Sequence, residues 1–240
     1  MKKTIAFIFA RGGSKGLPFK NKLILSEHPL IAYSIYIAKI NPLINDVYVS
    51  TDSEEIAKIA IDYGAKTIVR PTELAQDNSP EFLSWKHAVD FLFQKGLYFE
   101  QFISLPPTSP LRSKKDIDVC LNELKSKDEI VITVTPSNRN PWFNMVTLDN
   151  NQNASQLLLG KKINRRQDAP ESFDITTIAY TTSTNFIKKF SSIWEGKVKG
   201  VIIPKERAID IDDQYDFFVA EQLIKKRRDL IFNKNSLKLL

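Results

Sequence analysis

The chain has 240 residues, of which 42% are hydrophobic and 26% are charged, so it can bury one substantial core and is not of the disordered class. Its formal net charge of +6 fits an anionic small substrate, a nucleic-acid partner or an incidentally basic surface. The single cysteine, Cys120, excludes a disulfide within the chain and favours a reducing compartment. The apolar run at residues 5–10 is too short for an export signal, and no stretch is long enough to span a membrane, so we expect no membrane partner.

The first part of the chain alternates between short apolar runs and longer segments with helical spacing. The predicted strands cover residues 4–10, 46–52, 66–70, 101–107 and 130–136. The predicted helices cover residues 28–40, 53–64, 80–96 and 114–126. Ser53 is expected to be an N-cap, Pro80 a first helical residue, and Gly64 and Gly96 helix-ending glycines. This alternation predicts an α/β, Rossmann-like fold with a mostly parallel sheet and helices on both faces.

The rhythm changes after Pro136, where the chain becomes rich in asparagine, proline and charge. We expect residues 137–180 to form a small protruding lobe of hairpin and irregular structure, and residues 1–136 and 181–240 to form the core. A strand over residues 175–182 should return to the main sheet, followed by a core strand over 198–204 and a helix over 215–232. The basic run at residues 225–228 is expected to be a solvated helix end, and without an aromatic platform it predicts no nucleic-acid partner.

The segment "FARGGSKGLPFKNK" at residues 9–22 follows the first predicted strand directly. Ligands of parallel sheets bind beyond the carboxyl ends of the strands, which is where this segment begins. Its glycines can bring backbone N–H groups close to a ligand, and its cations favour a polyanion such as a nucleoside triphosphate. The spacing is neither that of a Walker A loop nor that of a dinucleotide-binding loop, and a flexible basic turn is the alternative interpretation.

Five segments, in this order, resemble the acylneuraminate cytidylyltransferases, the CMP-sialic acid synthetase family: "ARGGSKGLPFKN", "VYVSTDSEEIA", "RPTELAQDNSP", "PPTSPLR" and "IDIDDQYDF". The resemblance extends from residue 5 to about residue 221. It implies a nucleotide-diphospho-sugar transferase type of fold and the coupling of CTP to a 2-keto nonulosonic acid, with release of pyrophosphate. It also implies dependence on Mg²⁺, a cytoplasmic location, and a homodimer whose protruding lobes are exchanged between subunits.

The resemblance further implies roles for individual residues. The expected catalytic cations, which hold the phosphates and steady the leaving pyrophosphate, are Arg11, Lys15 and Lys20. The other expected CTP-binding residues are Ala10, Gly12, Gly13, Asn21, Arg70 and Ser79, the last two as contacts of the cytosine base. The expected sugar-binding residues are Arg166 and Tyr180.

The "IDID" segment is the candidate metal site. We expect residues 209–212 to form a strand, in which Asp210 and Asp212 share one face and Ile209 and Ile211 point into the core. Two neighbouring carboxylates repel each other unless a cation lies between them, and Mg²⁺ commonly binds one or two carboxylates together with phosphate oxygens. The alternative is a pair of carboxylates at a hairpin edge. Asp213, with Asp216 three residues later, is predicted to be the N-cap of the last helix. Both the glycine loop and the acidic pair should therefore lie against one nucleotide.

The sugar side departs from the pattern of the resembled family. Pro106 stands where the family usually has glutamine, Phe143 where many members have lysine, and Asp174 where a second arginine is common. Because a site built to bond one substituent rejects analogues that lack it, these changes predict a nonulosonic acid other than N-acetylneuraminate, such as a legionaminic or 8-amino type. A CMP-Kdo-type synthetase and a non-catalytic nucleotide-binding module are the alternatives, and no residue is identified as the general base.

Overall fold

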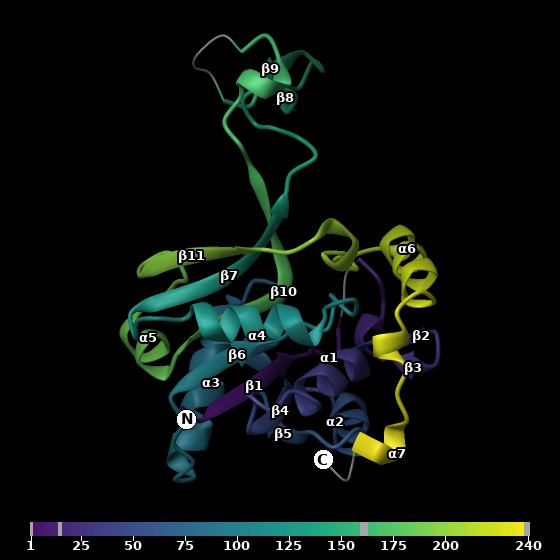
Figure 1. The fold of residues 1–240 in the computed structure, drawn as a ribbon, viewed down its shortest axis with the longest axis vertical. Helices are drawn as coiled ribbons and strands as arrows, with labels where there is room; N and C mark the ends of the chain where they lie inside the picture. Colours follow the sequence, from purple (N-terminus) through teal and green to yellow (C-terminus); the bar gives the residue numbers. More distant parts are fainter. Residues whose placement is uncertain (1, 14–15, 159–162, 238–240) are drawn as a thin grey trace.

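The computed structural model describes residues 2–13, 16–158 and 163–237, and its centre is a seven-stranded sheet (Figure 1). The strand order is β11-β7-β10-β6-β1-β4-β5, and every neighbouring pair is parallel except those of β10, which runs antiparallel to β6 and β7. The strands are β1 (Thr4–Phe9), β4 (Asp46–Thr51), β5 (Lys66–Val69), β6 (Gln101–Ser104), β7 (Glu129–Pro136), β10 (Phe173–Ser183) and β11 (Lys197–Ile202). The predicted mostly parallel α/β sheet is confirmed.

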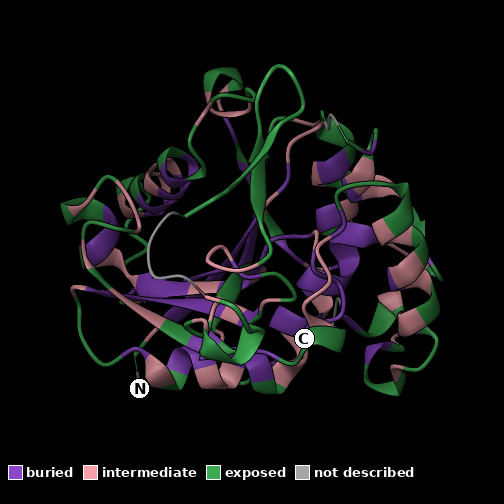
Figure 2. Ribbon diagram, turned by 90° about the horizontal axis from the view of Figure 1, so that it is seen from above, coloured by how far each residue is buried: buried purple, intermediate pink, exposed green. Residues whose placement is uncertain are grey.

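Helices cover both faces of this sheet. The side chains of β1 alternate between the two faces, and each face carries an apolar core that helices bury. Ala6 and Ile8 belong to one core, and Ile5 and Phe7 belong to the other. The first core is completed by α1 (Leu30–Lys39), α2 (Glu54–Asp62), α4 (Lys114–Glu123) and α6 (Gln214–Ile224). The second is completed by α3 (Glu81–Gln94) and α5 (Thr184–Lys189). The buried residues lie along the sheet and on the helix surfaces that face it (Figure 2).

The helix boundaries follow the predicted capping residues with two corrections. Ser53 accepts a hydrogen bond from the N–H of Ile56, and Gly64 and Gly96 have positive φ values of 82° and 74°, which a residue with a Cβ rarely adopts. Pro80 is the N-cap and not the first helical residue of α3. The helix predicted from residue 28 begins at Leu30, because β3 (His28–Pro29) pairs with β2 (Ile24–Leu25).

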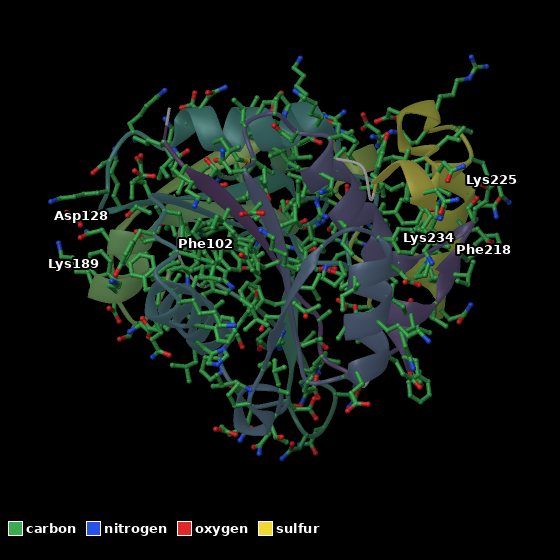
Figure 3. The ribbon with its side chains drawn as sticks, turned by 90° about the horizontal axis from the view of Figure 1, so that it is seen from below. Phe102, Asp128, Lys189, Phe218, Lys225 and Lys234 are labelled. Carbon is green, nitrogen blue, oxygen red and sulfur yellow. The ribbon has the colours of Figure 1, made fainter. Side chains whose placement is uncertain are left out.

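The predicted C-terminal helix over residues 215–232 is wrong in its second half. The α6 helix ends at Ile224, and the basic run leaves Lys225 at the molecular surface (Figure 3). Arg227 turns back to pair with Asp229 at 2.6 Å, and a short 3-10 turn, η5 (Arg228–Leu230), buries Leu230. A short α7 (Lys234–Leu237) follows. Among the described residues, no helix is both long and apolar enough to cross a membrane.

The described residues of the segments 137–158 and 163–172 leave the sheet between β7 and β10 and form a lobe that projects from it (Figure 1). A hairpin of β8 (Val146–Leu148) and β9 (Ala154–Gln156) lies near its tip. The β10 strand already pairs with β7 at Phe173, so the predicted lobe boundary at residue 180 falls inside a strand of the main sheet. One continuous strand therefore connects the lobe to the centre of the sheet.

Arg112 ties the loop after β6 to the rest of the core. Its side chain is fully buried, and its Nε and Nη2 donate to the carbonyls of Ile178 at 2.8 Å and Thr177 at 3.2 Å. It also donates to the carbonyl of Pro106 and to the hydroxyl of Ser34 on α1. Burial lowers the pKa of this guanidinium, but four acceptors compensate its desolvation. Arg112 thus fixes Pro106 relative to β10.

We expect Arg112→Ala to lower the free energy of unfolding by about 3 kcal/mol or more, because it opens a cavity and leaves several buried carbonyls without donors. Urea unfolding followed by circular dichroism measures this loss. Lys115→Ala, an exposed change on α4, which begins two residues after Arg112, is the control and should have almost no effect. Equal stability of the two variants would contradict the anchoring role.

Candidate active site

A cleft of about 350 Å³ lies at the carboxyl ends of β1 and β6, where ligands bind in sheets of this kind. Separate parts of the chain line it: residues of the 9–21 loop, of the 70–84 segment and of the 106–108 turn, together with Thr177, Asp210 and Asp212. The tertiary structure therefore brings the glycine loop and the acidic pair into one hollow. It also brings Arg70 and Ser79 there.

The glycine loop offers both charge and backbone to this cleft. Arg11 forms an ion pair with Asp77, and Asn21, which is buried, donates from Nδ2 to the carbonyl of Arg11 at 3.1 Å. The N–H of Gly12 already donates to Oδ1 of Asp52 at 2.9 Å, whereas a Cβ placed on Gly13 would have no neighbour within 4 Å. Gly13 is therefore the better candidate for close approach to a ligand.

Two further members of the predicted set are placed differently. Ala10 lines no part of the cleft as described: it is fully buried, and its N–H donates to the carbonyl of Ser50 at 3.1 Å. Lys15, a predicted catalytic cation, lies outside the described residues.

The acidic segment is not a strand, which corrects the prediction for residues 209–212. Ile211 is fully buried, and its N–H donates to the carbonyl of Thr108 at 2.9 Å, so the alternation of side chains survives without a sheet partner. A Cβ on Gly16 would lie 2.4 Å from the carbonyl oxygen of Asp212, so the loop backbone packs directly on this segment. The predicted capping box of Asp213 and Asp216 begins α6 immediately afterwards.

Lys20 joins the glycine loop to the acidic segment. Its Nζ donates to the carbonyl of Ile211 at 2.5 Å and to Oδ1 of Asp212 at 2.9 Å. Only 11% of the Lys20 side chain is exposed, against 76% of the Asp212 side chain. The lysine is therefore held in place by the segment that carries the two carboxylates.

Asp210 differs from Asp212 in its surroundings. Its Oδ1 is buried and has no hydrogen-bond partner among the described residues. Burial raises the pKa of Asp210, and the nearby Asp212 raises it further, while the hydroxyl of Thr108 opposes the shift. A buried carboxylate oxygen without a donor is a suitable ligand for a cation. Since the described residues contain no cluster of three or more acidic, histidine or cysteine ligands, a cation here would need oxygens from a bound substrate as well.

Arg70 and Ser79, the predicted base contacts, differ in how free their side chains are to bind a ligand. Arg70 is 93% enclosed, since only 7% of it is exposed, and it donates from Nε to the hydroxyl of Ser50 at 3.3 Å while lying over the Phe9 ring. Burial lowers the pKa of Arg70 to about 10. The Oγ of Ser79 is buried with no hydrogen-bond partner in the described part of the chain. Ser79 thus remains open to a ligand, while Arg70 mainly shapes the floor.

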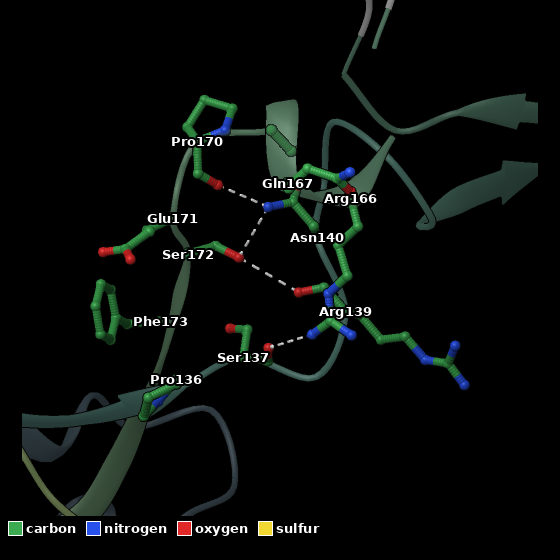
Figure 4. Close-up of a pocket in the computed structure, with 11 residues that line it drawn as sticks. Pro136, Ser137, Arg139, Asn140, Arg166, Gln167, Pro170, Glu171, Ser172 and Phe173 are labelled. Carbon is green, nitrogen blue, oxygen red and sulfur yellow. Dashed lines mark hydrogen bonds between the residues drawn. The ribbon is translucent and has the colours of Figure 1, made fainter. Parts of the chain in front are cut away.

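The two predicted sugar contacts are not brought together. Tyr180 lies on β10 next to Trp85, with 5.6 Å between ring centroids, and burial together with the carboxyl of Glu81 raises its pKa to about 12. Arg166 lies in the lobe, where it lines a separate hollow of about 560 Å³ and donates to the carbonyl of Ser137 at 3.4 Å (Figure 4). Within one chain, therefore, Arg166 is not part of the cleft.

Comparison with known families identifies the family of the chain. The family model described as "Cytidylyltransferase" matches residues 5–231, which is nearly the whole chain and includes every segment that lines the cleft. The chain belongs to the cytidylyltransferase family.

Three relatives resemble this cytidylyltransferase over almost its entire length. The post-translational flagellin modification protein B of Campylobacter coli is 34% identical, with 95% of this chain and 97% of the relative covered. The CMP-N,N'-diacetyllegionaminic acid synthase of Campylobacter jejuni is 34% identical, with coverage of 93% and 96%. The N-acylneuraminate cytidylyltransferase of Escherichia coli is 35% identical over 94% of this chain, which spans only 53% of that relative.

The fold has counterparts among solved structures. A CMP:2-keto-3-deoxy-manno-octonic acid synthetase complexed with CTP superposes with a TM-score of 0.67, covering 94% of this chain and 99% of the other. The sequence identity is 15%, so this likeness concerns the nucleotide-diphospho-sugar transferase fold alone.

Several cleft residues of this cytidylyltransferase were not found by sequence reasoning. Asp77 pairs with Arg11, and Thr177 arrives from β10 to bond the hydroxyl of Ser109 at 2.6 Å. Glu81 follows a proline at the start of a helix, where an acidic residue is ordinary, so nothing in the sequence marks it. Of these residues, only Asp77 lies in a segment that the sequence had marked, "RPTELAQDNSP".

We expect Asp210→Asn to raise the free energy of unfolding of the ligand-free protein at about pH 8. The pKa of Asp210 is raised in the folded state, so its ionised form costs stability, and this cost appears as pH rises through the ordinary carboxyl range toward the folded pKa. The gain should therefore shrink as pH falls to about 4.

Urea unfolding at both pH values measures the effect of this substitution. Asp90→Asn, at an exposed position of α3, is the matched control and should change neither value. A destabilised Asp210→Asn protein at the higher pH would contradict the idea that ionised Asp210 costs stability in the folded state.

Proposed function

We propose that this cytidylyltransferase couples CTP to a 2-keto nonulosonic acid, forming a CMP-sugar and releasing pyrophosphate. The observation that carries the proposal is the bridge from Lys20 to Asp212, which holds a cationic glycine loop and a pair of carboxylates in one cleft. Relatives that act on N-acylneuraminate and on N,N'-diacetyllegionaminic acid support this class of acceptor. A reaction of this kind fits a cytoplasmic setting, where CTP is present.

Transfer of a nucleotidyl group depends mainly on positioning and on neutralising the phosphate charge. Arg11 and Lys20 line the cleft, and their charges would attract the triphosphate and stabilise the pyrophosphate as it leaves. Asp210 and Asp212 would hold Mg²⁺, which when bound supplies additional positive charge to the phosphate oxygens. The free Oδ1 of Asp210 fits this role, because it has no competing donor among the described residues.

Two departures from the resembled family, Pro106 in the cleft and Asp174 at the base of the lobe, favour an acceptor other than N-acetylneuraminate. Pro106, which lines the cleft, contributes no side-chain hydrogen bond. Asp174 lies at the base of the lobe and accepts from the hydroxyl of Ser137 at 2.6 Å. Proline in place of glutamine at position 106 removes a side-chain amide, and aspartate in place of arginine at position 174 replaces a cation with an anion. Both changes alter which sugar substituents can form hydrogen bonds with the protein. The likeness to the octonic acid synthetase rests on fold, so it does not favour an eight-carbon acceptor.

We further propose a homodimer in which each lobe completes the cleft of the other subunit. Arg166 is the predicted contact for the acidic sugar, yet it lines a hollow of the lobe and not the cleft of its own chain. The lobe and its base also expose large apolar side chains, namely Met145, Val146, Leu148, Leu157, Leu158, Phe173 and Ile175. Exposed apolar surface of this kind marks an interface, and a second copy would cover it.

We expect CTP and Mg²⁺ to support pyrophosphate release with at least one 2-keto nonulosonic acid, and more slowly with N-acetylneuraminate and with the eight-carbon acid. A panel of acids, with products identified by mass, measures this preference. Asp212→Ala should lower turnover by about 100-fold or more while the circular dichroism spectrum stays unchanged. No release with any acid would refute the proposed function, and full activity of Asp212→Ala would refute the metal assignment.

The shared site predicts complementation between two inactive variants. Arg166→Ala removes the lobe contribution, and Asp212→Ala removes the metal contribution, so each homodimer should be nearly inactive. Co-expressed subunits that assemble at random should recover about a quarter of the normal activity, because half of the dimers contain one intact site. Recovery at no more than the sum of the two variants would contradict the exchange of lobes. Arg165→Ala, which lies beside Arg166 and pairs with Asp168, is the control and should leave activity nearly unchanged.

A further inference from the structure

The β10 strand is irregular where it passes the cleft. It pairs with β7 up to Thr176 and again from Tyr180, so residues 177–179 have no partner on β7. Its pairing with β6 also begins only at Tyr180. The strand therefore bulges between these two residues, and Thr177 in the bulge lines the cleft together with Asp210. Bulges beside active sites commonly turn a side chain toward the site.

Two buried side chains bond the backbone of the bulge in place of the sheet ladder. Arg112 donates to the carbonyl of Thr177 at 3.2 Å and to that of Ile178 at 2.8 Å. The hydroxyl of Thr133 on β7 accepts from the N–H of Ala179 at 3.2 Å. Because these groups are bonded inside the core, the bulge has a fixed position. The side chain of Thr177 is therefore held at the cleft wall.

Thr177 is the middle member of a chain of three hydroxyl groups. Thr108 donates to it at 3.2 Å, and its oxygen lies 2.6 Å from the Oγ of Ser109. Ser109 donates to the carbonyl of Ile209 at 3.1 Å, and a carbonyl can only accept. Because a hydroxyl has one proton, Thr177 is the donor in its bond with Ser109. The chain thus ends on the peptide group that joins Ile209 to Asp210.

Asp210 is held on both sides by the turn that carries Thr108 and Ser109. Ser109 bonds the peptide group before it, and the carbonyl of Thr108 accepts from the N–H of Ile211, in the peptide group after it, at 2.9 Å.

The same hydroxyls also act on the carboxyl of Asp210. Burial raises the pKa of Asp210, and hydrogen bonds from Thr108 and Thr177 to the ionised carboxyl oppose this rise. The proton of Thr177 is therefore shared between Ser109 and the carboxylate. Oδ1 of Asp210 still has no partner among the described residues. The carboxyl is thus oriented by the protein while one of its oxygens is left for a ligand.

We propose that Thr177 is a positioning residue, whose hydroxyl, placed by the bulge of β10, holds Asp210 with its Oδ1 open toward the metal ion of a bound nucleotide. This inference rests on the proposed function, in which Asp210 is a candidate metal ligand. Residues that hydrogen-bond a metal ligand orient it, and their loss commonly weakens metal binding by about 10- to 100-fold. Thr177 acts through Asp210 and needs no contact with the nucleotide.

The test compares the wild-type chain with Thr177→Val, which removes the hydroxyl and keeps the branched shape, and with Thr177→Ser, which keeps the hydroxyl. Calorimetry measures the dissociation constant of CTP in Mg²⁺ and in EDTA, with no acceptor acid present. The ratio of the two constants is the metal effect. Thr182→Val is the matched control, because Thr182 is also a threonine of β10 that donates to a backbone carbonyl, that of Glu129 at 2.8 Å, but it does not line the cleft.

Thr177→Val should reduce the metal effect by about tenfold or more, while the dissociation constant of CTP in EDTA changes by less than about threefold. In assays with an accepted acid, the Mg²⁺ concentration at half-maximal turnover should rise by a similar factor. Thr177→Ser should bring both values back to within about threefold of the wild type. Thr182→Val should lower the free energy of unfolding but leave the metal effect unchanged.

Three results would overturn the inference. An unchanged metal effect in Thr177→Val would exclude a role in positioning Asp210. Equal losses in Thr177→Val and Thr177→Ser would assign the effect to the shape of the bulge and not to the hydroxyl. Weaker binding of CTP in EDTA would make Thr177 a contact of the nucleotide itself.

Failure of the proposed function is distinguishable from failure of this inference. A wild-type chain that shows the metal effect but transfers CMP to no acid would refute the proposed function alone. A wild-type chain whose affinity for CTP does not respond to Mg²⁺ would refute the metal assignment and the role of Thr177 together.

Discussion

The ammonium group of Lys20 holds together two segments that lie 191 residues apart in the chain. Its bonds to the carbonyl of Ile211 and the carboxylate of Asp212 close one side of the cleft. The lysine is mostly buried, so little water competes for its ammonium group, although the carboxylate of Asp212 is largely exposed and that ion pair is partly screened. The glycine loop gains a fixed position from this bridge, and so does the acidic segment that has no sheet partner of its own.

Some charged groups of the cleft are already paired within the protein, and others are left for a ligand to bind. Arg11 is paired with Asp77 and Lys20 with Asp212, so the cations are held in place before a phosphate arrives. Asp210 has no ion-pair partner among the described residues, and burial raises its pKa. A cleft that fixes its cations in advance and leaves one buried carboxyl without an ion pair is suited to bind an anion together with a metal ion.

The antiparallel strand β10 connects the cleft to the lobe. Near its middle it supplies Thr177 to the cleft wall and Tyr180 to the packing behind Glu81, and at its start it pairs with the end of β7 beneath the lobe. Arg112 fixes this strand to the 106–108 turn through the carbonyls of Thr177 and Ile178. A displacement of the lobe would therefore shift the cleft residues on β10, because the strand and its buried arginine form one packed unit.

The sequence by itself determined the alternating strands and helices, the caps at Ser53 and Asp213, and the meeting of the glycine loop with the acidic pair, because local patterns and the rule for parallel sheets suffice for these. It wrongly predicted a strand at residues 209–212, since alternation of side chains does not require a sheet partner. Only the tertiary structure decided that Gly12 is occupied by Asp52, that Arg166 lies away from the cleft of its own chain, and that Glu81 faces it. These outcomes depend on contacts between residues far apart in the chain, and such contacts leave no periodic or local signal to read.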